Sequence, residues 1–299
     1  MSNIASLLLR AALLVGISFS YQAMALVVPS KTNVVANSQE SAVRPMDSSE
    51  ENVQNLGRRA FLGVAGSLTL APLPAQSLSP EEAARDYDTY STNYDDLDGG
   101  QASNVLGIEE ARSTLFRQAR GAVLEIGAGT GLNLNKYENT KVTSLTLVDI
   151  SDGMLQEAKK RVSSIKSLNG IPVKFINADA SSQLVELFGK GSFDTVVDSF
   201  SLCVMGNEGA RKCLDQLRQV VKTKENAGQV LLLENSRSSN PLLGLYQDVT
   251  ADAAASAGGK GCVYNQDVAS MIRSTPGMSI ENEELYAAGL FRSYRCVVH

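Results

Sequence analysis

The sequence predicts an α/β protein: a doubly wound, seven-stranded, mostly parallel sheet with helices on both faces. Short apolar runs typical of buried strands alternate with helix-forming stretches from about residue 79 onward. A glycine-rich turn follows the first of these runs, and acidic residues follow the next ones, at the strand ends where such sheets bind ligands. With 299 residues, 43% of them hydrophobic, the chain is long enough for one large core.

A strong helix start opens the folded part. Ser79 is a plausible N-cap, Pro80 stands at the first helical position, and Glu82 completes a capping box. The domain is therefore predicted to span residues 79–299. Tyrosines at helical spacing follow, the last of them Tyr94, and such a stripe is commonly a packing face.

The first strand, residues 123–126, enters a turn with glycine at positions 127, 129 and 131. Glycine tolerates positive φ and has no Cβ, so the backbone of such a turn can touch a ligand. A dinucleotide fingerprint is excluded because its third glycine would fall on a leucine in either register, and a P-loop is excluded because no Gly-Lys-Ser/Thr follows.

The segment E-x-G-x-G-x-G, from Glu125 to Gly131, resembles the first motif of class I S-adenosylmethionine-dependent methyltransferases. That cofactor carries a sulfonium and an ammonium group, so an acid beside the turn suits it better than a phosphate cradle would. The resemblance implies a Rossmann-like methyltransferase fold with one antiparallel strand at the C-terminal edge, and S-adenosyl-L-methionine as the cofactor.

Further acids follow the next two strands. The run 142–148 ends at Asp149, placed to accept ribose hydroxyls, and Ser151 is a plausible N-cap of the next helix. The run 173–180 contains Asp179. The resemblance implies that Met154 packs on the adenine and that Asp179 accepts from its amino group. It also implies that Tyr94 folds over the cofactor as a lid. The residues predicted to contact the cofactor are Tyr94, Glu125, Gly127, Ala128, Gly129, Gly131, Asp149, Ile150, Met154, Asp179, Ala180 and Asp198.

The alternation continues to the end of the chain. The sequence predicts further helices and strands in this order: helix 183–188, strand 193–198, helix 209–222, strand 229–234, helices 242–255 and 265–274, and strands 279–286 and 293–298.

The substrate is expected at the ends of the fourth and fifth strands, residues 198–203 and 234–237. The Asn/Asp-Pro-Pro-Tyr motif of enzymes that methylate amines on bases or glutamine is absent there, which disfavours that reaction. The only histidine is the last residue, so any catalytic base is predicted to be Asp198 or Glu234. Both acids can equally be structural.

Six segments between residues 85 and 298 resemble the methyltransferase-like proteins of animal endoplasmic reticulum and fungal mitochondria, with a type 11 methyltransferase domain. These segments are 94–95, 106–107, 123–131, 198–203, 232–235 and 261–267. Animal members are associated with thiol S-methylation, and members are often membrane-tethered. Asn235 departs from the Glu-His pair expected there. We therefore expect transfer to a small-molecule thiol, phenol or quinone-like acceptor. The alternative is a catalytically weak or inactive assembly factor for a thylakoid complex.

The N-terminal residues predict targeting rather than fold. Residues 1–25 resemble a signal peptide, 26–56 a transit segment, and 57–76 a twin-arginine thylakoid transfer signal. Together they favour a plastid of secondary origin, in the thylakoid lumen or membrane. The mitochondrion, the endoplasmic reticulum membrane and an uncleaved membrane anchor stay open.

Charge and cysteine usage narrow the partners. The net charge is −5 and the folded part has no basic cluster, which excludes nucleic acid as an expected partner. None of the four cysteines belongs to a C-x-x-C pair, so no metal is predicted. A disulfide between Cys262 and Cys296 is one option. We expect a monomer acting on a small molecule, with peripheral or anchored membrane association left open.

Overall fold

The computed structural model describes residues 78–97, 106–257 and 261–299. The predicted targeting segments 1–25, 26–56 and 57–76 lie outside the described residues. The seven strands are β1 (Gly121–Ile126), β2 (Val142–Asp149), β3 (Val173–Asn177), β4 (Thr195–Ser199), β5 (Gln229–Asn235), β6 (Met278–Tyr286) and β7 (Phe291–Val298). The α-helices are α2 (Pro80–Tyr90), α3 (Tyr94–Leu97), α5 (Ile108–Phe116), α6 (Asp152–Val162), α7 (Leu184–Phe188), α8 (Leu202–Val220), α9 (Pro241–Ala257) and α10 (Val268–Ser274).

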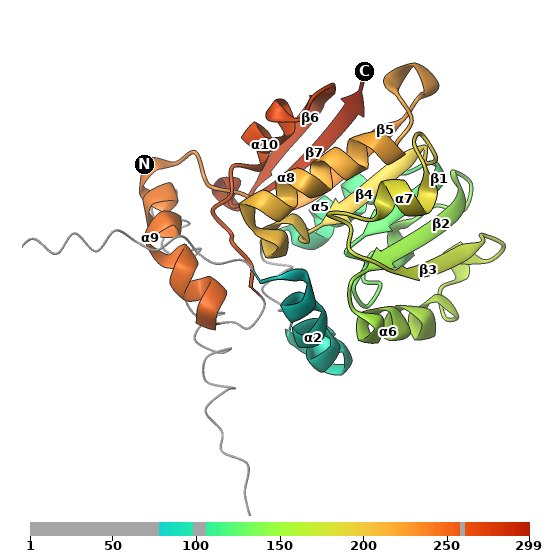
Figure 1. Ribbon diagram of the computed structural model, residues 1–299, viewed down its shortest axis with the longest axis horizontal. Coiled ribbons are helices and arrows are strands. Elements are labelled where there is room, and N and C mark those ends of the chain that lie inside the picture. The colour runs from blue at the N-terminus through green and yellow to red at the C-terminus, as the bar shows by residue number, and fades with distance from the viewer. Residues whose placement is uncertain (1–77, 98–105, 258–260) are drawn as a thin grey trace, which may run out of the picture. The chain divides into compact units, whose positions relative to one another are not determined.

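These strands form one sheet in the order β3-β2-β1-β4-β5-β7-β6 (Figure 1). Strands β1 to β5 are parallel, and β7 runs antiparallel to both of its neighbours, β5 and β6. The predicted fold class is confirmed, with the reversed strand lying between β5 and β6 at the C-terminal end of the sheet. The chain changes direction of winding between β1 and β4, and this switch point is where such sheets bind ligands.

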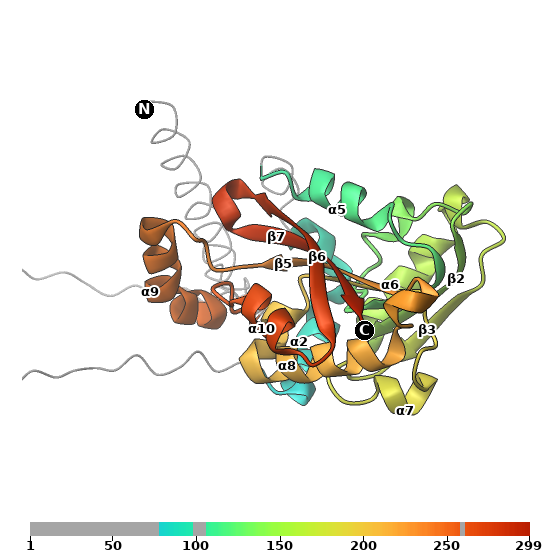
Figure 2. The same cartoon turned by 90° about the horizontal axis from the view of Figure 1, so that it is seen from above.

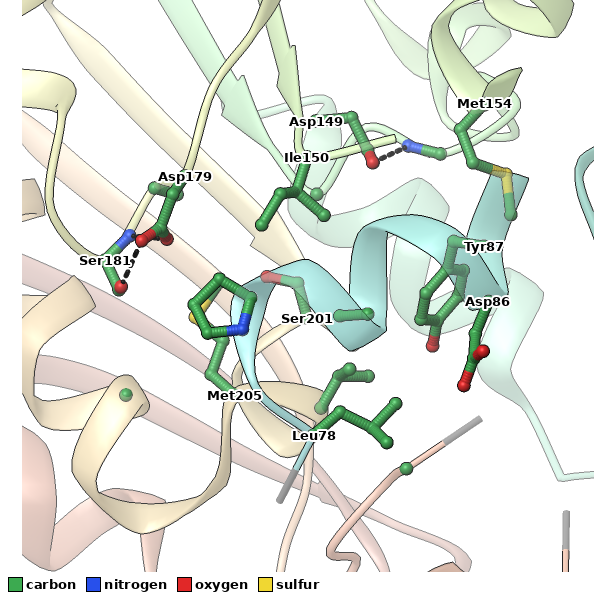
Figure 3. A pocket seen from close by; sticks show the side chains of 18 of the residues that line it. Leu78, Asp86, Tyr87, Asp149, Ile150, Met154, Asp179, Ser181, Ser201 and Met205 are labelled. Atoms are coloured by element: carbon green, nitrogen blue, oxygen red, sulfur yellow. Dashed lines mark hydrogen bonds between the residues drawn. The ribbon is translucent and has the colours of Figure 1, made fainter. Parts of the chain in front are cut away.

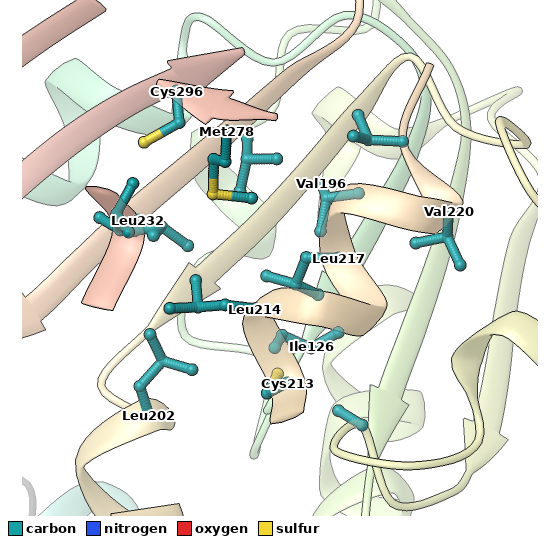
Figure 4. Packing of buried hydrophobic residues seen from close by; sticks show 14 of the residues in the cluster. Ile126, Val196, Leu202, Cys213, Leu214, Leu217, Val220, Leu232, Met278 and Cys296 are labelled. Carbon is teal, nitrogen blue, oxygen red and sulfur yellow. The ribbon is translucent and has the colours of Figure 1, made fainter. Parts of the chain in front are cut away.

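The sheet separates two apolar clusters, as the alternation of side chains along a strand requires. On one face Leu124 and Ile126 of β1 pack in a cluster with residues of α7, α8 and α10. Figure 4 shows Ile126 of this cluster beside Leu214 and Leu217 of α8. On the other face Val123 of β1 packs with residues of α5 and α6. The view along the sheet shows α5 and α8 on opposite faces (Figure 2). The central strands are therefore buried on both sides, which is why their sequences are continuously apolar.

The helix starts follow the local sequence signals. The Ser79 side chain accepts from the backbone N–H of Glu82, the Glu82 carboxylate accepts from the N–H of Ser79, and the predicted capping box is confirmed. Ser151 caps α6, as predicted, by accepting from Met154 N–H. Helix α8 begins seven residues earlier than predicted, because a first turn precedes Gly206, whose positive φ of 66° kinks the helix.

Among the described residues, the large apolar side chains with the highest exposed fractions lie on helix α9 (Pro241–Ala257). Leu242, Leu245 and Val249, spaced as one helix face, are 81%, 59% and 73% exposed. Within the described part of the chain, none of the helices combines the length and apolar character needed to cross a bilayer.

Candidate cofactor site

A cavity of about 1150 Å³ lies at the carboxyl ends of the parallel strands (Figure 3). The loops after β1, β2, β3 and β4 form its inner wall, and α2 with the start of α8 closes the other side. Of the residues predicted to contact the cofactor, those that line it are Tyr94, Gly127, Gly129, Asp149, Ile150, Met154, Asp179 and Ala180.

Two glycines of the turn line the cavity, at backbone conformations that disfavour any residue with a side chain. Gly127 and Gly129 have φ values of +54° and +55°, a region that favours glycine. A Cβ on Gly127 would lie 2.4 Å from the Cβ of Ser201. A Cβ on Gly129 would meet nothing closer than the Gly127 carbonyl oxygen at 3.9 Å, so its missing side chain leaves open space on the cavity side.

Asp149 joins the end of β2 to this turn. Its Oδ2 accepts from the backbone N–H of Gly129 at 2.8 Å, and its Oδ1 accepts from the N–H of Ser151 at 2.9 Å. Burial raises the pKa of Asp149 to about 6, while these backbone donors oppose the shift. A carboxylate oxygen has two lone pairs, so each keeps capacity for a ligand hydroxyl.

Two further loops complete the inner wall. Met154 is almost completely buried in the first turn of α6, and its side chain reaches the cavity. Asp179 lies two residues beyond the end of β3, where its carboxylate accepts from Ser181 N–H at 2.8 Å and from the hydroxyls of Ser181 and Ser182. Ile150 and Met154 thus form an apolar wall between two carboxylates. That of Asp149 suits hydroxyl donors, and that of Asp179 suits amino donors.

The N-terminal segment is tied to the glycine turn and to α6. Asp95 accepts from the hydroxyl of Thr130 at 2.6 Å and pairs with Arg161. Asp88 accepts from the Ser151 hydroxyl at 2.6 Å and from Gly153 N–H at 2.9 Å. Tyr94 therefore lines the cavity from a segment that these contacts hold in place, and its predicted role as a lid over the cofactor stays a prediction.

Glu125, Ala128 and Gly131 do not line the cavity, and their predicted contact with the cofactor stays a prediction. The Glu125 carboxylate is buried and accepts from Tyr137 Oη at 2.7 Å and from Asn133 Nδ2 at 2.8 Å. Ala128 is buried, and its N–H donates to the Val148 carbonyl. These residues hold the shape of the turn.

Gly131 is turned toward α6 rather than the cavity. Its φ is +80°, and a Cβ there would lie 2.5 Å from Leu134 Cδ1. Its role is close packing of the segment that follows the turn.

Asp198 and Glu234 also lie behind the cavity wall rather than in it. Both are fully buried. Asp198 Oδ1 accepts from the Ser201 hydroxyl, and Glu234 Oε1 accepts from the N–H groups of Ser201 and Leu202 at 3.0 and 3.2 Å. Ser201, not either acid, lines the cavity. The predicted contact of Asp198 with the cofactor, and the predicted role of either acid as a base, stay predictions.

Sequence reasoning missed much of the outer wall. Leu78, Ala83 and Tyr87 come from α2 and the residue pair before it, and Met205 from the first turn of α8. Of these four residues, the helical spacing of the tyrosines could have pointed only to Tyr87. The other three line the cavity because of how α2 and α8 approach the sheet. Ser201 stands in a segment expected to meet substrate, but nothing in the sequence singles out its hydroxyl.

The cysteines are all free thiols. Cys262 lies beside Cys203 rather than Cys296, because Asn235 Nδ2 donates to Cys203 and Cys262 at 3.5 and 3.2 Å. A hydrogen bond with Cys262 raises the pKa of the Cys203 thiol well above its ordinary value. Within the described ranges, no group of three or more metal-ligating side chains is found.

The site's chemistry fits S-adenosylmethionine. Gly129 leaves room for the cofactor to approach the backbone, Asp149 offers acceptors for ribose hydroxyls, and Asp179 offers acceptors for an amino group. Met154 supplies an apolar surface for an aromatic base. The contact of each of these residues with the cofactor stays a prediction.

Comparison with known proteins points the same way. A family model described as a methyltransferase domain matches residues 123–224. The mitochondrial methyltransferase OMS1 of Saccharomyces cerevisiae is 25% identical over 212 residues, covering 67% of this chain and 43% of that protein. The ubiquinone/menaquinone biosynthesis C-methyltransferase UbiE of Ectopseudomonas mendocina is 28% identical over 176 residues, covering 57% of this chain and 65% of that protein. The chain thus spans less than two thirds of the length of either relative.

Two solved structures show the same fold. An O-methyltransferase family protein from Burkholderia thailandensis superposes with a TM-score of 0.54 at 18% sequence identity. The match covers 75% of this chain and 64% of that protein's chain. A SAM-dependent methyltransferase from Leishmania major superposes with a TM-score of 0.51 at 16% sequence identity. The match covers 73% of this chain and 82% of that protein's chain. Residues 123–224 thus match a methyltransferase domain, and the fold and the cavity of the described chain support a class I, S-adenosylmethionine-dependent methyltransferase.

Proposed function

We propose that this chain transfers the methyl group of S-adenosylmethionine to a small, mainly apolar acceptor: a thiol, a phenol or a quinone-like molecule. The observation that carries the proposal is the shared cavity, in which the cofactor wall continues into a group of apolar side chains, Phe200, Val204 and Met205. When bound, this cofactor supplies an electrophilic methyl group on a positively charged sulfur. The residues of the chain then have to hold the acceptor in line with that group and exclude water.

The outer wall supports a neutral, apolar acceptor. Phe200, Val204 and Met205 line the cavity after β4, opposite the acids of the inner wall. Among the described residues Lys212 is the one basic residue that lines the cavity, and it is paired with Glu208 at 2.7 Å. A phosphorylated or nucleic-acid acceptor needs basic groups to neutralise its charge, so this wall disfavours both. The bacterial relative acts in ubiquinone and menaquinone biosynthesis, which supports including a quinone-like acceptor.

Phe200 is held in place at some conformational cost. Its φ is +60°, which is uncommon for a residue with a side chain, and its ring packs edge-on against Phe291 with centroids 5.8 Å apart. The Arg112 guanidinium lies over the same ring at 5.3 Å. Strained backbone is retained where the surrounding structure requires it, commonly at functional sites. Phe200 is therefore our candidate for packing against the acceptor.

Calorimetric titration with S-adenosylmethionine, followed by turnover against thiols, phenols and quinols, tests this function. We expect saturable cofactor binding and transfer to at least one of these classes. Asp149→Asn is the matched variant, since it retains the shape of the side chain while removing the charge beside the glycine turn. Binding without transfer to any acceptor would favour the alternative of a non-catalytic assembly factor, and absence of binding would overturn the proposal.

We also propose a plastid of secondary origin as the location, with the thylakoid lumen or membrane as the final site. This part rests on the order of sequence signals within residues 1–76. Peripheral membrane association is included because the exposed apolar face of α9 has no partner among the described residues. A fluorescent fusion of residues 1–80 tests the address, and a mitochondrial signal would overturn it. Flotation with liposomes tests the membrane contact.

A further inference from the structure

Three side chains form a continuous polar path from the cavity into the core. Ser201 lines the cavity, and its Oγ lies against the glycine turn, 2.9 Å from where a Cβ on Gly127 would stand. The Ser201 hydroxyl donates to Asp198 Oδ1. A side-chain hydrogen bond then joins Asp198 to Glu234 on the neighbouring strand. Figure 3 shows Ser201 in the cavity wall, beside Met205.

The two acids share one proton. Among the described side chains, Asp198 Oδ2 and Glu234 Oε2 have no other hydrogen-bond donor, and both atoms are buried. Two carboxyl groups joined by a hydrogen bond inside a protein cannot both be ionised. A single proton between them satisfies both oxygens, because one acid then donates to the other. The pair consequently carries one negative charge.

The charge lies on Asp198. Burial together with the nearby Asp198 charge raises the pKa of Glu234 well above its usual range, although Glu234 Oε1 accepts two backbone N–H groups that oppose the shift. Burial raises the pKa of Asp198 only to about 6, since hydrogen bonds from Glu234 and Ser201 oppose the shift. At neutral pH Glu234 is therefore protonated and Asp198 is the acceptor that faces Ser201.

Acids and thiols, rather than cations, are the titratable groups that interact most with Asp198 in the described part of the chain. The titratable groups that interact with it are Glu125 on β1, Glu234 on β5, and Cys203 and Cys213 on α8. The pKa values of both thiols are raised well above their ordinary value, Cys203 by a hydrogen bond with Cys262 and Cys213 by burial, so both stay neutral.

We propose that Ser201, Asp198 and Glu234 form a proton relay that deprotonates the methyl acceptor. The acceptor's O–H or S–H gives its proton to Ser201 Oγ while Ser201 passes its own proton to Asp198 Oδ1. The electron pair left on the acceptor forms the new bond to the methyl carbon, and the pair of the broken S–C bond stays on sulfur as a neutral thioether. Ser201 touches the acceptor, and the two acids position it and hold the proton. This inference rests on the proposed function.

A comparison of acceptors that differ in acidity tests the relay. The probes are phenol with 4-nitrophenol, and an alkyl thiol with an aryl thiol, at a pH where only the second member of each pair is largely ionised. We expect Ser201→Ala and Asp198→Asn to lower kcat on the neutral member about 100-fold, and on the ionised member by no more than about threefold, since general-base help is needed only for the neutral form. A purely structural role would lower both rates alike.

Ser199→Ala is the matched control, because it removes another hydroxyl from the same cavity wall outside the relay. It is expected to change the rates on both members of a pair equally.

On the neutral acceptor, wild-type kcat should fall as the pH is lowered through about 6, because Asp198 then takes up a proton and can no longer accept one from Ser201. Calorimetry with S-adenosylmethionine shows whether each variant still folds and binds the cofactor.

Infrared difference spectroscopy provides a readout that needs no turnover. At pH 7 the difference between the wild type and Glu234→Gln should contain the C=O band of one buried protonated carboxyl group. Glu125→Gln should retain that band, because Glu125, whose pKa is raised to about 7, gives a separate one. Absence of that band, or equal rate losses on both acceptors in Ser201→Ala, would overturn the relay while leaving the proposed function intact. A wild type that binds the cofactor but methylates none of the probes would overturn both.

Discussion

Replacement of Gly129 by alanine isolates the contact between the glycine turn and the cofactor. The residue has φ +55°, so the new side chain costs about 1–2 kcal/mol of stability in the left-handed region. It causes no clash within the protein, because the nearest atom to the added Cβ is 3.9 Å away. The methyl group instead occupies cavity space where the cofactor is predicted to approach the backbone. We expect the Kd for S-adenosylmethionine to rise about 10- to 100-fold, or about 1.4–2.8 kcal/mol.

Isothermal calorimetry gives the Kd, and thermal unfolding gives the stability. Gly191→Ala is the control for strain alone: its φ is +63°, no atom lies within 4 Å of the added Cβ, and it does not line the cavity. It should lose the same stability as Gly129→Ala but keep the wild-type Kd. Cofactor binding unchanged in Gly129→Ala, or weakened equally in Gly191→Ala, would refute the placement of the cofactor against this turn.

Four further outcomes are expected. Asp149→Asn should weaken cofactor binding about tenfold or more, because the amide turns a donor toward one of two backbone N–H groups; a wild-type Kd by calorimetry would contradict this. Tyr137→Phe should lower the free energy of unfolding by about 1–3 kcal/mol in urea titrations, since Glu125 Oε2 loses its donor while still buried. Burial raises the pKa of Glu125 to about 7, so the folded state binds its proton more tightly than the unfolded state does. The free energy of unfolding should therefore fall as the pH rises through about 7, by an amount on the order of 3 kcal/mol. Glu125→Gln should flatten that pH dependence. A maleimide should label Cys262 first, because the other three thiols are buried, and peptide mapping checks the order.

Much of the fold could be predicted because its signals are local. Buried parallel strands need continuous apolar runs, and Ser79 and Ser151 are caps whose chemistry acts within three residues. Where a tertiary interaction sets a boundary, prediction was less accurate. The early start of α8 depends on Glu234, a residue of another strand, which accepts from the N–H groups of Ser201 and Leu202.

The sequence by itself determined the cofactor wall of this protein. Gly129, Asp149, Met154 and Asp179 each follow or flank a strand end, and parallel strands bring such ends together at one edge of the sheet. Only the tertiary structure decided which polar groups face the cavity. Glu125 and Asp198 look like ligands in the sequence, yet Tyr137, Asn133, Ser201 and Glu234 engage their carboxylates inside the core. The physical reason is that a buried acid must find partners, and those partners come from residues distant in the chain or on other elements.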